Sequence, residues 1–579
     1  MPLDNQTGLN PAQYSIYVFG YGQADTASRP AVPAMELQSN GQFAAIAANS
    51  SGTIQSYNIS TMSSITLSAA TPVNSGILYF VAVPNGQAPP SLTYSTDSND
   101  VLSITSGIPG NPPNSNPPFN IVEFTEPGDG TNYPVLDASA VNGFTFPLTV
   151  TLNNNLGQVG QNLSNPAVNR ASILAAYTSF MDGQGTDGSP YQDLVFAPNS
   201  IDGQAGGIVN PNLYLANGAN PSSLLNSVWN SALTTLFETT GRTVSMIGDD
   251  GDYYQGTPKQ VSGQWVIHFV GYTDSTDTTP NGNVFNIYSP LTPDTSGTSY
   301  NANESAGEMV FGGDNVFNDQ SANVLISTNS GSVSSADVAK GLERDINEAL
   351  NRGVALLGPS GVNAGMSGGA STYWGTETNW YPAGQTENLY SLFMHTATIN
   401  GTPIFTLPSG AVKDAQGTLM AQAYGFAFDE NPGHGPAGQP NVPSKWEPVP
   451  AGTTTATITL GPWVQSPSPS SSSSPSSEGS PGQLVTVFLL AQDEFAYMVD
   501  GVFLRFTNDP LFTQAADRAM NLLDDMLPVD NHALFTGLSG LQSAIYANPY
   551  CGTMWGSVAA NVALESAGGV FSNMDSTSS

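Results

Sequence analysis

The chain has 579 residues, of which 39% are hydrophobic, with 60 Gly and 43 Pro. This composition is typical of a β-rich, loop-rich protein and excludes a simple helical bundle. The chain carries 45 Asp and Glu against 11 Lys and Arg, a formal net charge of −34, so nucleic acids and anionic membrane surfaces repel it. A neutral polysaccharide remains compatible with this charge.

Cys551 is the single cysteine, which excludes an internal disulfide framework and a cysteine zinc site. The N-terminal MPLDNQTGLN has neither the basic nor the apolar region of a signal peptide. No apolar run in the sequence is long enough to cross a bilayer. We expect an extracellular or cell-surface protein, although no signal peptide is visible.

Residues 13–160 contain short runs of β-branched and aromatic residues, separated by Asn, Gly, Ser and Pro. The clearest runs are SIYVFGYG (15–22), FAAIAAN (43–49), SSITLSA (63–69) and GILYFVAVP (76–84). Repeated short strands with turn residues between them are typical of a sandwich or barrel. We therefore predict a β-barrel or sandwich domain here.

The stretch from Phe119 to Val150 contains two more β-like runs, joined by a turn rich in Gly, Asp, Asn and Pro. Polar and apolar residues alternate in both runs, which is typical of paired strands. Glu123 lies in the middle of the first run, two residues before Thr125. Its carboxylate either projects into an open groove or lies on a solvated face of the sheet, as outward polar residues commonly do.

Over residues 161–399, helical and strand patterns alternate. Helical patterns begin at Asn220 and at Ser334, and WVIHFVGY (265–272) and EMVFGG (308–313) have the composition of strands. Interleaved helices and strands of this kind predict an inserted α/β domain. The fold class that follows is a β-rich α+β protein.

After a tail at 1–12, the β domain is expected to comprise 13–160 together with 400–463, where β patterns return. A Ser/Pro-rich segment, 464–483, is low in complexity and predicts a linker or loop. Residues 484–579 form a C-terminal strand-plus-helix extension that opens with the apolar run VTVFLL. An exposed apolar strand pairs readily with a neighbour, so this extension is a candidate for self-association.

The sequence has no metal-binding histidine spacing, P-loop, nucleophile elbow or dinucleotide fingerprint. We therefore expect no metal and no cofactor. The remaining candidates for catalytic residues are carboxylates. They are Glu123, and Asp429 with Glu430, which lie at the end of another predicted strand. Glycoside hydrolysis uses two carboxylates, one to protonate the leaving oxygen and one to activate water or attack carbon. The Trp380 ring is a candidate surface on which a sugar stacks.

Several motifs, taken together, resemble glycoside hydrolase family 64, the thaumatin-like endo-β-1,3-glucanases, over roughly residues 13–463. They are NIVEFTEPGDG, VLDASAVNGFTFPLTV, PSSLLNSVWNSAL, ALNRGVALL and AYGFAFDE, in this order along the chain. The resemblance implies a thaumatin-like β-barrel domain beside an α/β domain, with a groove between them for β-1,3-glucan. It also implies an inverting mechanism, Glu123 as the catalytic Glu, and Thr125, Ser139 and Asp429 as residues at the sugar sites.

The chain departs from the family pattern at one catalytic position, where Asn142 replaces the family Asp. An amide does not exchange a proton in the useful range, so it cannot act as general acid or base. Asp137 is the possible substitute, and it stands where the family usually has Asn, so the two residue types are exchanged. Five positions separate the two residues, so an unbroken strand would point them to opposite faces. Only a bulge, which Gly143 permits, would bring Asp137 round.

Two functions follow from these features. The first is an inverting endo-β-1,3-glucanase that uses Glu123 with a displaced carboxylate, Asp137 or Asp429. The second is a catalytically inactive glucan-binding or extracellular structural, self-assembling protein that has kept the fold. In both the partner is a neutral polysaccharide, with no nucleic acid and no membrane. A second carboxyl at roughly 6.5–9.5 Å from that of Glu123 favours the enzyme, and Asn142 alone facing Glu123 favours binding.

Overall fold

The computed structural model divides the chain into two compact units, residues 1–468 and 469–579. Several sheets and few helices make up the described chain, which confirms the β-rich part of the predicted fold class. The residues that the structure describes are 1–24, 32–98, 101–107, 117–127, 134–153, 156–198, 201, 205–248, 250–291, 305–312, 335–358, 373–408, 410, 412–426, 429, 445–446, 449–463, 485–489, 495–499 and 502–506.

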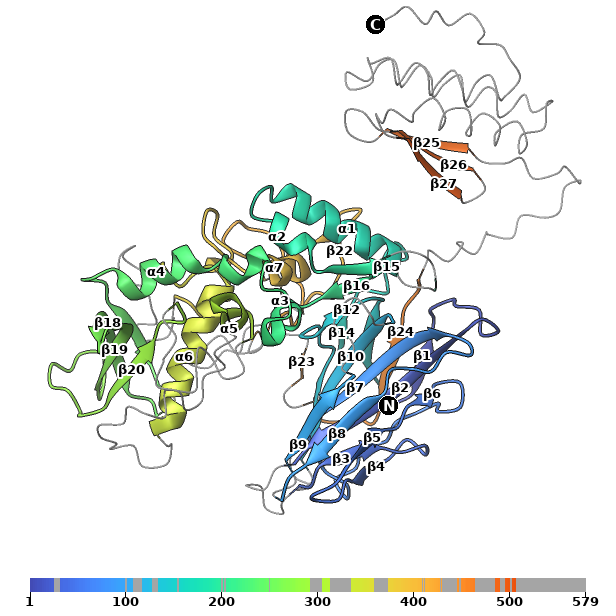
Figure 1. Ribbon diagram of the computed structural model, residues 1–579, viewed down its shortest axis with the longest axis horizontal. Coiled ribbons are helices and arrows are strands. Elements are labelled where there is room, and N and C mark those ends of the chain that lie inside the picture. The colour runs from blue at the N-terminus through green and yellow to red at the C-terminus, as the bar shows by residue number, and fades with distance from the viewer. Residues whose placement is uncertain are drawn as a thin grey trace, which may run out of the picture. The chain divides into compact units, whose positions relative to one another are not determined.

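The largest sheet has the strand order β23-β11-β10-β7-β2-β3-β4, with β6 paired to β2. Figure 1 shows its three long strands, β2, β7 and β10, side by side, and all of their pairings are antiparallel. Aromatic and β-branched residues fill these strands, which suits the pleated surface. The strands are β2 (Tyr14–Gln23), β3 (Met35–Leu37), β4 (Phe43–Ala45), β6 (Tyr57–Asn58), β7 (Val73–Pro84), β10 (Phe119–Glu126), β11 (Val135–Asp137) and β23 (Lys445–Trp446).

One face of the large sheet packs against a second, four-stranded sheet. Val18, Phe80 and Val122 of the large sheet share a fully buried core with Val150 and Ile458 of the second. None of the described sheets closes on itself, so the described strands form a sandwich and not the closed barrel that was the other expectation. The second sheet consists, in order, of β1 (Leu3–Asn5), β24 (Ala456–Leu460), β13 (Leu148–Leu152) and β14 (Gln158–Gly160).

The opposite face of the large sheet belongs to a second core that continues into the helices and smaller sheets. The helices are α1 (Arg170–Gly183), α2 (Ser189–Gln192), α3 (Pro211–Leu215), α4 (Asn230–Glu238), α5 (Ala306–Gly312), α6 (Ser335–Asn351) and α7 (Leu389–Thr396). The smaller sheets are β5 (Ser51–Ile54) with β8 (Leu92–Thr96) and β9 (Leu102–Ser106); β12 (Gly143–Phe144) with β16 (Ala205–Val209) and β15 (Val195–Pro198); β17 (Val244–Ile247), β18 (Tyr253–Val261), β19 (Gln264–Tyr272) and β20 (Val284–Tyr288); and β21 (Thr398–Ile399) with β22 (Thr402–Pro403).

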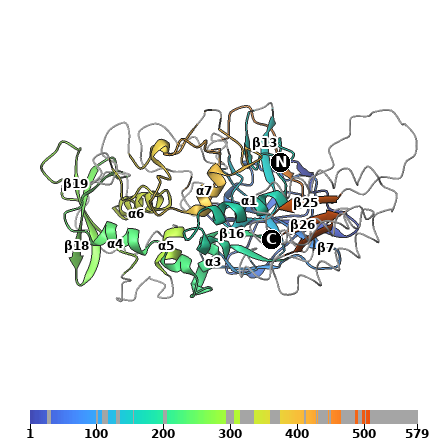
Figure 2. The same ribbon diagram turned by 90° about the horizontal axis from the view of Figure 1, so that it is seen from above.

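Helix α4 lies beside strands β18 and β19, and Figure 2 shows the same neighbours from above. Short 3₁₀ turns lie at Ala216–Gly218, Leu224–Ser227 and Glu377–Asn379. The described helices include none that is both long and apolar enough to span a bilayer.

The helix predicted from Ser334 is confirmed as α6, and Gly353 follows its end with a φ of +71° that favours glycine. The helix predicted from Asn220 begins later, as a 3₁₀ turn (Leu224–Ser227) followed by α4. EMVFGG is wrong as a strand, because its residues lie in helix α5. A short apolar run does not distinguish a strand from a buried helix.

In the second unit, the structure describes one antiparallel sheet of β25 (Val485–Leu489), β26 (Phe495–Val499) and β27 (Val502–Phe506). The predicted VTVFLL strand is therefore present as β25, and its partner is β26 of the same chain. The predicted helix of the extension, and Cys551, lie outside the described residues.

Candidate functional site

Glu123 and Asp137 lie directly opposite each other in the register of β10 and β11. Directly opposed residues of an antiparallel pair project from the same face, with Cβ atoms about 4.5–5.5 Å apart. Glu123 is half-buried and Asp137 is only 4% exposed. The structure thus brings the two carboxylates together, whereas the spacing to Asn142 would place Asp137 on the other face of an unbroken strand.

The chain between Asp137 and Asn142 is not an unbroken strand. Strand β11 ends at Asp137, and a turn follows in which the Gly143 N–H donates to the Ala140 carbonyl at 2.9 Å. Gly143 has a φ of +117°, and a Cβ there would lie 2.3 Å from the Ile208 carbonyl oxygen. The turn therefore requires glycine, and it takes the place of the bulge that the sequence suggested.

A pair of tyrosines connects Asn142 with Glu123. Asn142 Nδ2 donates to the Tyr79 hydroxyl at 2.8 Å. Burial, then the neighbouring Tyr21 and the charge of Glu123, raise the pKa of Tyr79 well above its usual value. Burial also raises the pKa of Tyr21 to about 12; a hydrogen bond with Tyr79 opposes this shift and the charge of Glu123 adds to it. Both phenols therefore stay protonated at neutral pH, as hydrogen-bonding groups beside Glu123.

Thr125 and Ser139 each lie two residues after one of the two acids. Thr125 is half-buried next to a register shift in β10, and its hydroxyl accepts a hydrogen bond from the Ser75 N–H at 3.2 Å. Ser139 is 2% exposed, and its hydroxyl accepts from the Val141 N–H at 3.2 Å. Ser139 therefore shapes the turn before Asn142, and sugar contact by either residue stays a prediction.

Asp429 lies in a buried cluster of charged and polar groups. Its Oδ2 accepts hydrogen bonds from the Ser391 hydroxyl at 3.2 Å and the Gly425 N–H at 2.9 Å, and lies 3.2 Å from His395 Nε2. Its Oδ1 lies 3.6 Å from an Arg352 guanidinium nitrogen. Burial alone would raise the pKa of Asp429, but His395, Arg352 and the Gly425 N–H lower it overall. The carboxylate is thus held ionised inside the protein.

Trp380 is also buried, under the same cluster. The Arg352 guanidinium lies 4.0 Å from the centre of its ring and 5.5 Å from that of Phe426, and the Trp380 indole N–H donates to the Trp374 carbonyl at 2.7 Å. With no exposed surface, Trp380 supports the interior rather than offering a ring to solvent. Sugar binding by Asp429 or Trp380 stays a prediction, and Glu430 lies outside the described residues.

Glu387 lies beside this cluster, and we expect it to make the folding stability of the protein depend on pH. Burial, then the charges of Asp187 and Asp414, raise its pKa from 4.5 to about 8. Between these values the unfolded chain has lost the proton and the folded chain keeps it, so stability falls as pH rises, by at most about 1.4 kcal/mol per pH unit. We expect Glu387→Gln to flatten the decline of Tm from pH 5 to pH 8, with Glu238→Gln as control. An equal decline in Glu387→Gln and wild type would contradict this origin.

The described residues contain no group of three or more His, Cys, Asp or Glu side chains arranged to hold a metal ion. Two carboxylates of the acidic run GDDGDYY are used internally: Asp250 accepts from the Tyr254 hydroxyl at 2.7 Å, and Asp252 accepts from Asn281 Nδ2 at 2.5 Å.

Sequence reasoning missed Tyr21, Tyr79 and Arg352. The two tyrosines lie in strands that were correctly predicted, but nothing in the alternation separates a tyrosine of the core from one that contacts a carboxylate. Arg352 carried a signal, because the chain has only 11 Lys and Arg and this one follows directly after a helix. A cation that is rare in the sequence and buried in the fold needs an acidic partner.

No family model matches the chain, and no curated protein matches it. Among solved structures, the chain is similar to the crystal structure of a β-1,3-glucanase domain (GH64) from Clostridium beijerinckii, at 15% identity and a TM-score of 0.48 over 79% of this chain and 97% of that one. It is also similar to a laminaripentaose-producing β-1,3-glucanase in complex with laminaritetraose, at 16% identity and a TM-score of 0.44 over 80% and 98% of the two chains. The chain is thus distantly similar to solved β-1,3-glucanases.

Proposed function

We propose that this protein recognises β-1,3-glucan and hydrolyses it with Glu123 and Asp137 as its two carboxylates. The observation that carries the proposal is the direct pairing of these residues across β10 and β11. The domain arrangement that goes with it is a thaumatin-like β domain (13–160 and 400–463) with an α/β insertion (161–399) and a groove between them. An extracellular location belongs to the same proposal.

In this mechanism Glu123 is the general acid. The half-buried carboxyl group gives its proton to the glycosidic oxygen as the bond from that oxygen to the anomeric carbon breaks. Asp137, on the same face, stabilises the positive charge that develops on the sugar ring and bonds to the anomeric carbon. Water then attacks that carbon, gives its proton to the Glu123 carboxylate and breaks the bond to Asp137, which releases the sugar. The neutral phenols of Tyr21 and Tyr79 keep the surroundings of Glu123 free of further negative charge.

The configuration of the product at the anomeric carbon tests whether Asp137 is the second carboxylate beside Glu123. The Cβ atoms of directly opposed residues in an antiparallel pair lie about 4.5–5.5 Å apart, and both side chains project from one face. Retaining glycosidases separate their carboxyls by about 5–5.5 Å and inverting ones by about 6.5–9.5 Å. With Asp137 as partner we therefore expect retention, in contrast to the inversion that the family resemblance implies.

The experiment incubates the purified chain with laminarin and follows reducing-sugar release together with the anomer that forms first, by proton NMR. Release with the β-anomer first is the expected result. Release with the α-anomer first would exclude Asp137 as the nucleophile and indicate an inverting mechanism. A chain that pellets with insoluble β-1,3-glucan but releases no sugar would exclude hydrolysis.

A second function, glucan binding or a structural role without hydrolysis, is favoured by one specific observation. Asn142 occupies the position of the family Asp, and its amide donates a hydrogen bond to a buried phenol, a role that a carboxylate cannot fill. Asp137 is at the same time only 4% exposed. In this alternative the site keeps the shape of a hydrolase and lacks its second working carboxylate, and self-association through 484–579 belongs to it.

A further inference from the structure

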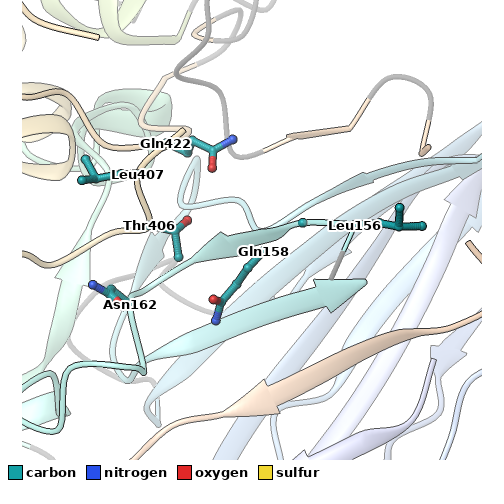
Figure 3. A pocket seen from close by; sticks show the side chains of 7 residues that line it. Leu156, Gln158, Asn162, Thr406, Leu407 and Gln422 are labelled. Atoms are coloured by element: carbon teal, nitrogen blue, oxygen red, sulfur yellow. The ribbon is translucent and has the colours of Figure 1, made fainter. Parts of the chain in front are cut away.

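A pocket of about 440 Å³ opens on the first unit, beside strand β14. Its volume lies within the range of about 300–1,000 Å³ that small-molecule sites occupy. Figure 3 shows its side chains, with Leu156 and Leu407 on opposite sides of the polar ones. The residues that line it are Leu156, Gly157, Gln158, Asn162, Thr406, Leu407 and Gln422, and neither Glu123 nor Asp137 is among them.

The backbone around this pocket is fixed by hydrogen bonds between segments that are far apart in the sequence. The Asn162 N–H donates to the Ile404 carbonyl at 2.7 Å, and the Thr406 N–H donates to the Gly160 carbonyl at 2.9 Å. The Gln422 N–H donates to the Thr406 carbonyl at 2.7 Å. Because three segments are bonded in this way, the pocket is formed before any ligand arrives, which lowers the entropic cost of binding.

The lining is uncharged, although the chain as a whole carries a net charge of −34. The amide side chains of Gln158, Asn162 and Gln422 each have both donors and an acceptor, as the hydroxyls of a sugar do. Leu156 and Leu407 are 37% and 43% exposed, so they offer apolar surface to the C–H face of a sugar ring. A neutral polyhydroxylated molecule matches this combination, and an ion does not.

Thr406 supplies an independent observation. The residue is 7% exposed, and its buried hydroxyl oxygen has no hydrogen-bond partner among the described residues. Buried polar groups are nearly always paired, so an unpaired one calls for an explanation. A ligand hydroxyl in the pocket would supply the missing partner.

We propose that this pocket binds a sugar residue of a neutral polysaccharide, as a second binding site outside the acid pair. A Cβ added at Gly160 would lie 3.2 Å from Cβ of Ala138, the residue after Asp137. Ala138 belongs with Leu136 to the core between the two sheets, so its side chain and that of Asp137 lie on opposite faces. The pocket is thus a site separate from the acid pair. The choice of β-1,3-glucan as this polymer rests on the proposed function.

The experiment measures laminarin binding by isothermal titration calorimetry in the Glu123→Gln background, so that no substrate is consumed. In this background, Gln158→Ala with Thr406→Val is expected to weaken laminarin binding by at least tenfold. Valine has the shape of threonine and removes only an unpaired hydroxyl, so the fold is preserved and Tm does not fall. The matched control carries the same pair of substitutions at exposed positions in and directly after strand β5, Thr53→Val with Gln55→Ala.

The proposal would be overturned if the pocket variant bound laminarin with unchanged affinity, or if the control variant lost as much affinity. It would also be overturned if the Glu123→Gln parent did not bind laminarin. Should the double variant unfold, Gln158→Ala alone, at a half-buried side chain, gives the same comparison. The catalytic proposal is tested separately. If the wild-type chain releases no sugar from laminarin, but the pocket substitutions still weaken binding, then hydrolysis is excluded and the pocket proposal stands.

Discussion

Glu123→Gln is expected to abolish sugar release from laminarin, with a loss of about 10³-fold or more. Glutamine fills the same space in the middle of β10, so the sheet and its pairing with β7 and β11 are kept. The amide has no acidic proton to give to the glycosidic oxygen. Binding of a neutral glucan depends on hydrogen bonds and apolar contact, so it is expected to remain. The measurement is reducing-sugar release beside pelleting with insoluble glucan.

Glu36→Gln is the matched control for this substitution. Glu36 lies in the same row of the large sheet, since it is opposite Tyr21, which is opposite Ile77, which in turn is opposite Glu123. It therefore shares the face of Glu123 but is three strands away. If sugar release falls equally in Glu123→Gln and Glu36→Gln, the loss is caused by the changed charge of the sheet. If release in Glu123→Gln equals that of the wild type, Glu123 is not part of the mechanism.

The sequence predicts the strands that carry the site better than it predicts their partners. The alternation around Glu123 identifies β10 because one face of that strand is buried, and burial of alternate residues leaves a period of two in the sequence. The pairing of Glu123 with Asp137 leaves no such trace, because register is decided by the two strands together. The five-residue spacing places Asp137 and Asn142 on opposite faces only in an unbroken strand, and the sequence does not reveal that β11 ends at Asp137 and a turn follows.

The buried cluster around Asp429 was out of reach for a different reason. Arg352, His395 and Asp429 come from a helix end, a second helix and a loop, and no pattern links residues 77 positions apart such as Arg352 and Asp429. The motif that contains Asp429 was recognisable. Its burial was not, because a carboxylate at the end of a predicted strand looks the same in the sequence whether it faces solvent or an arginine.

Asp137→Asn is expected to lower sugar release about as strongly as Glu123→Gln. Asp137 is the carboxylate that lies opposite Glu123 in the sheet, and asparagine keeps its size while removing its charge and its nucleophilic oxygen. Because Asp137 acts as the nucleophile, we expect a loss of at least about 10²–10⁴-fold, the range for removal of an acid–base group. Release that persists at the wild-type rate would exclude Asp137, and the second carboxylate would then have to be sought elsewhere.

Adding Asn142→Asp to Asp137→Asn restores the distribution of residue types that the family resemblance implies. We expect this double variant to release more sugar than Asp137→Asn alone. Tyr79 makes the exchange feasible: it now accepts from Asn142, and its hydroxyl can rotate to donate to a carboxylate instead. The comparison is reducing-sugar release by the two variants at equal concentration, after both are shown to unfold cooperatively.

The single variant Asn142→Asp separates compensation from loss of function. With Asp137 present, the new carboxylate would join two others in one partly buried cluster, and like charges at close range oppose ionisation. We therefore expect little or no gain from Asn142→Asp alone and a gain only when Asp137 is also replaced. Such non-additivity arises between residues that share partners, here Tyr79, whose hydroxyl contacts Asn142 and whose pKa responds to Glu123. Additive effects would mean that positions 137 and 142 act independently, and the exchange of residue types between them would then have no mechanistic meaning.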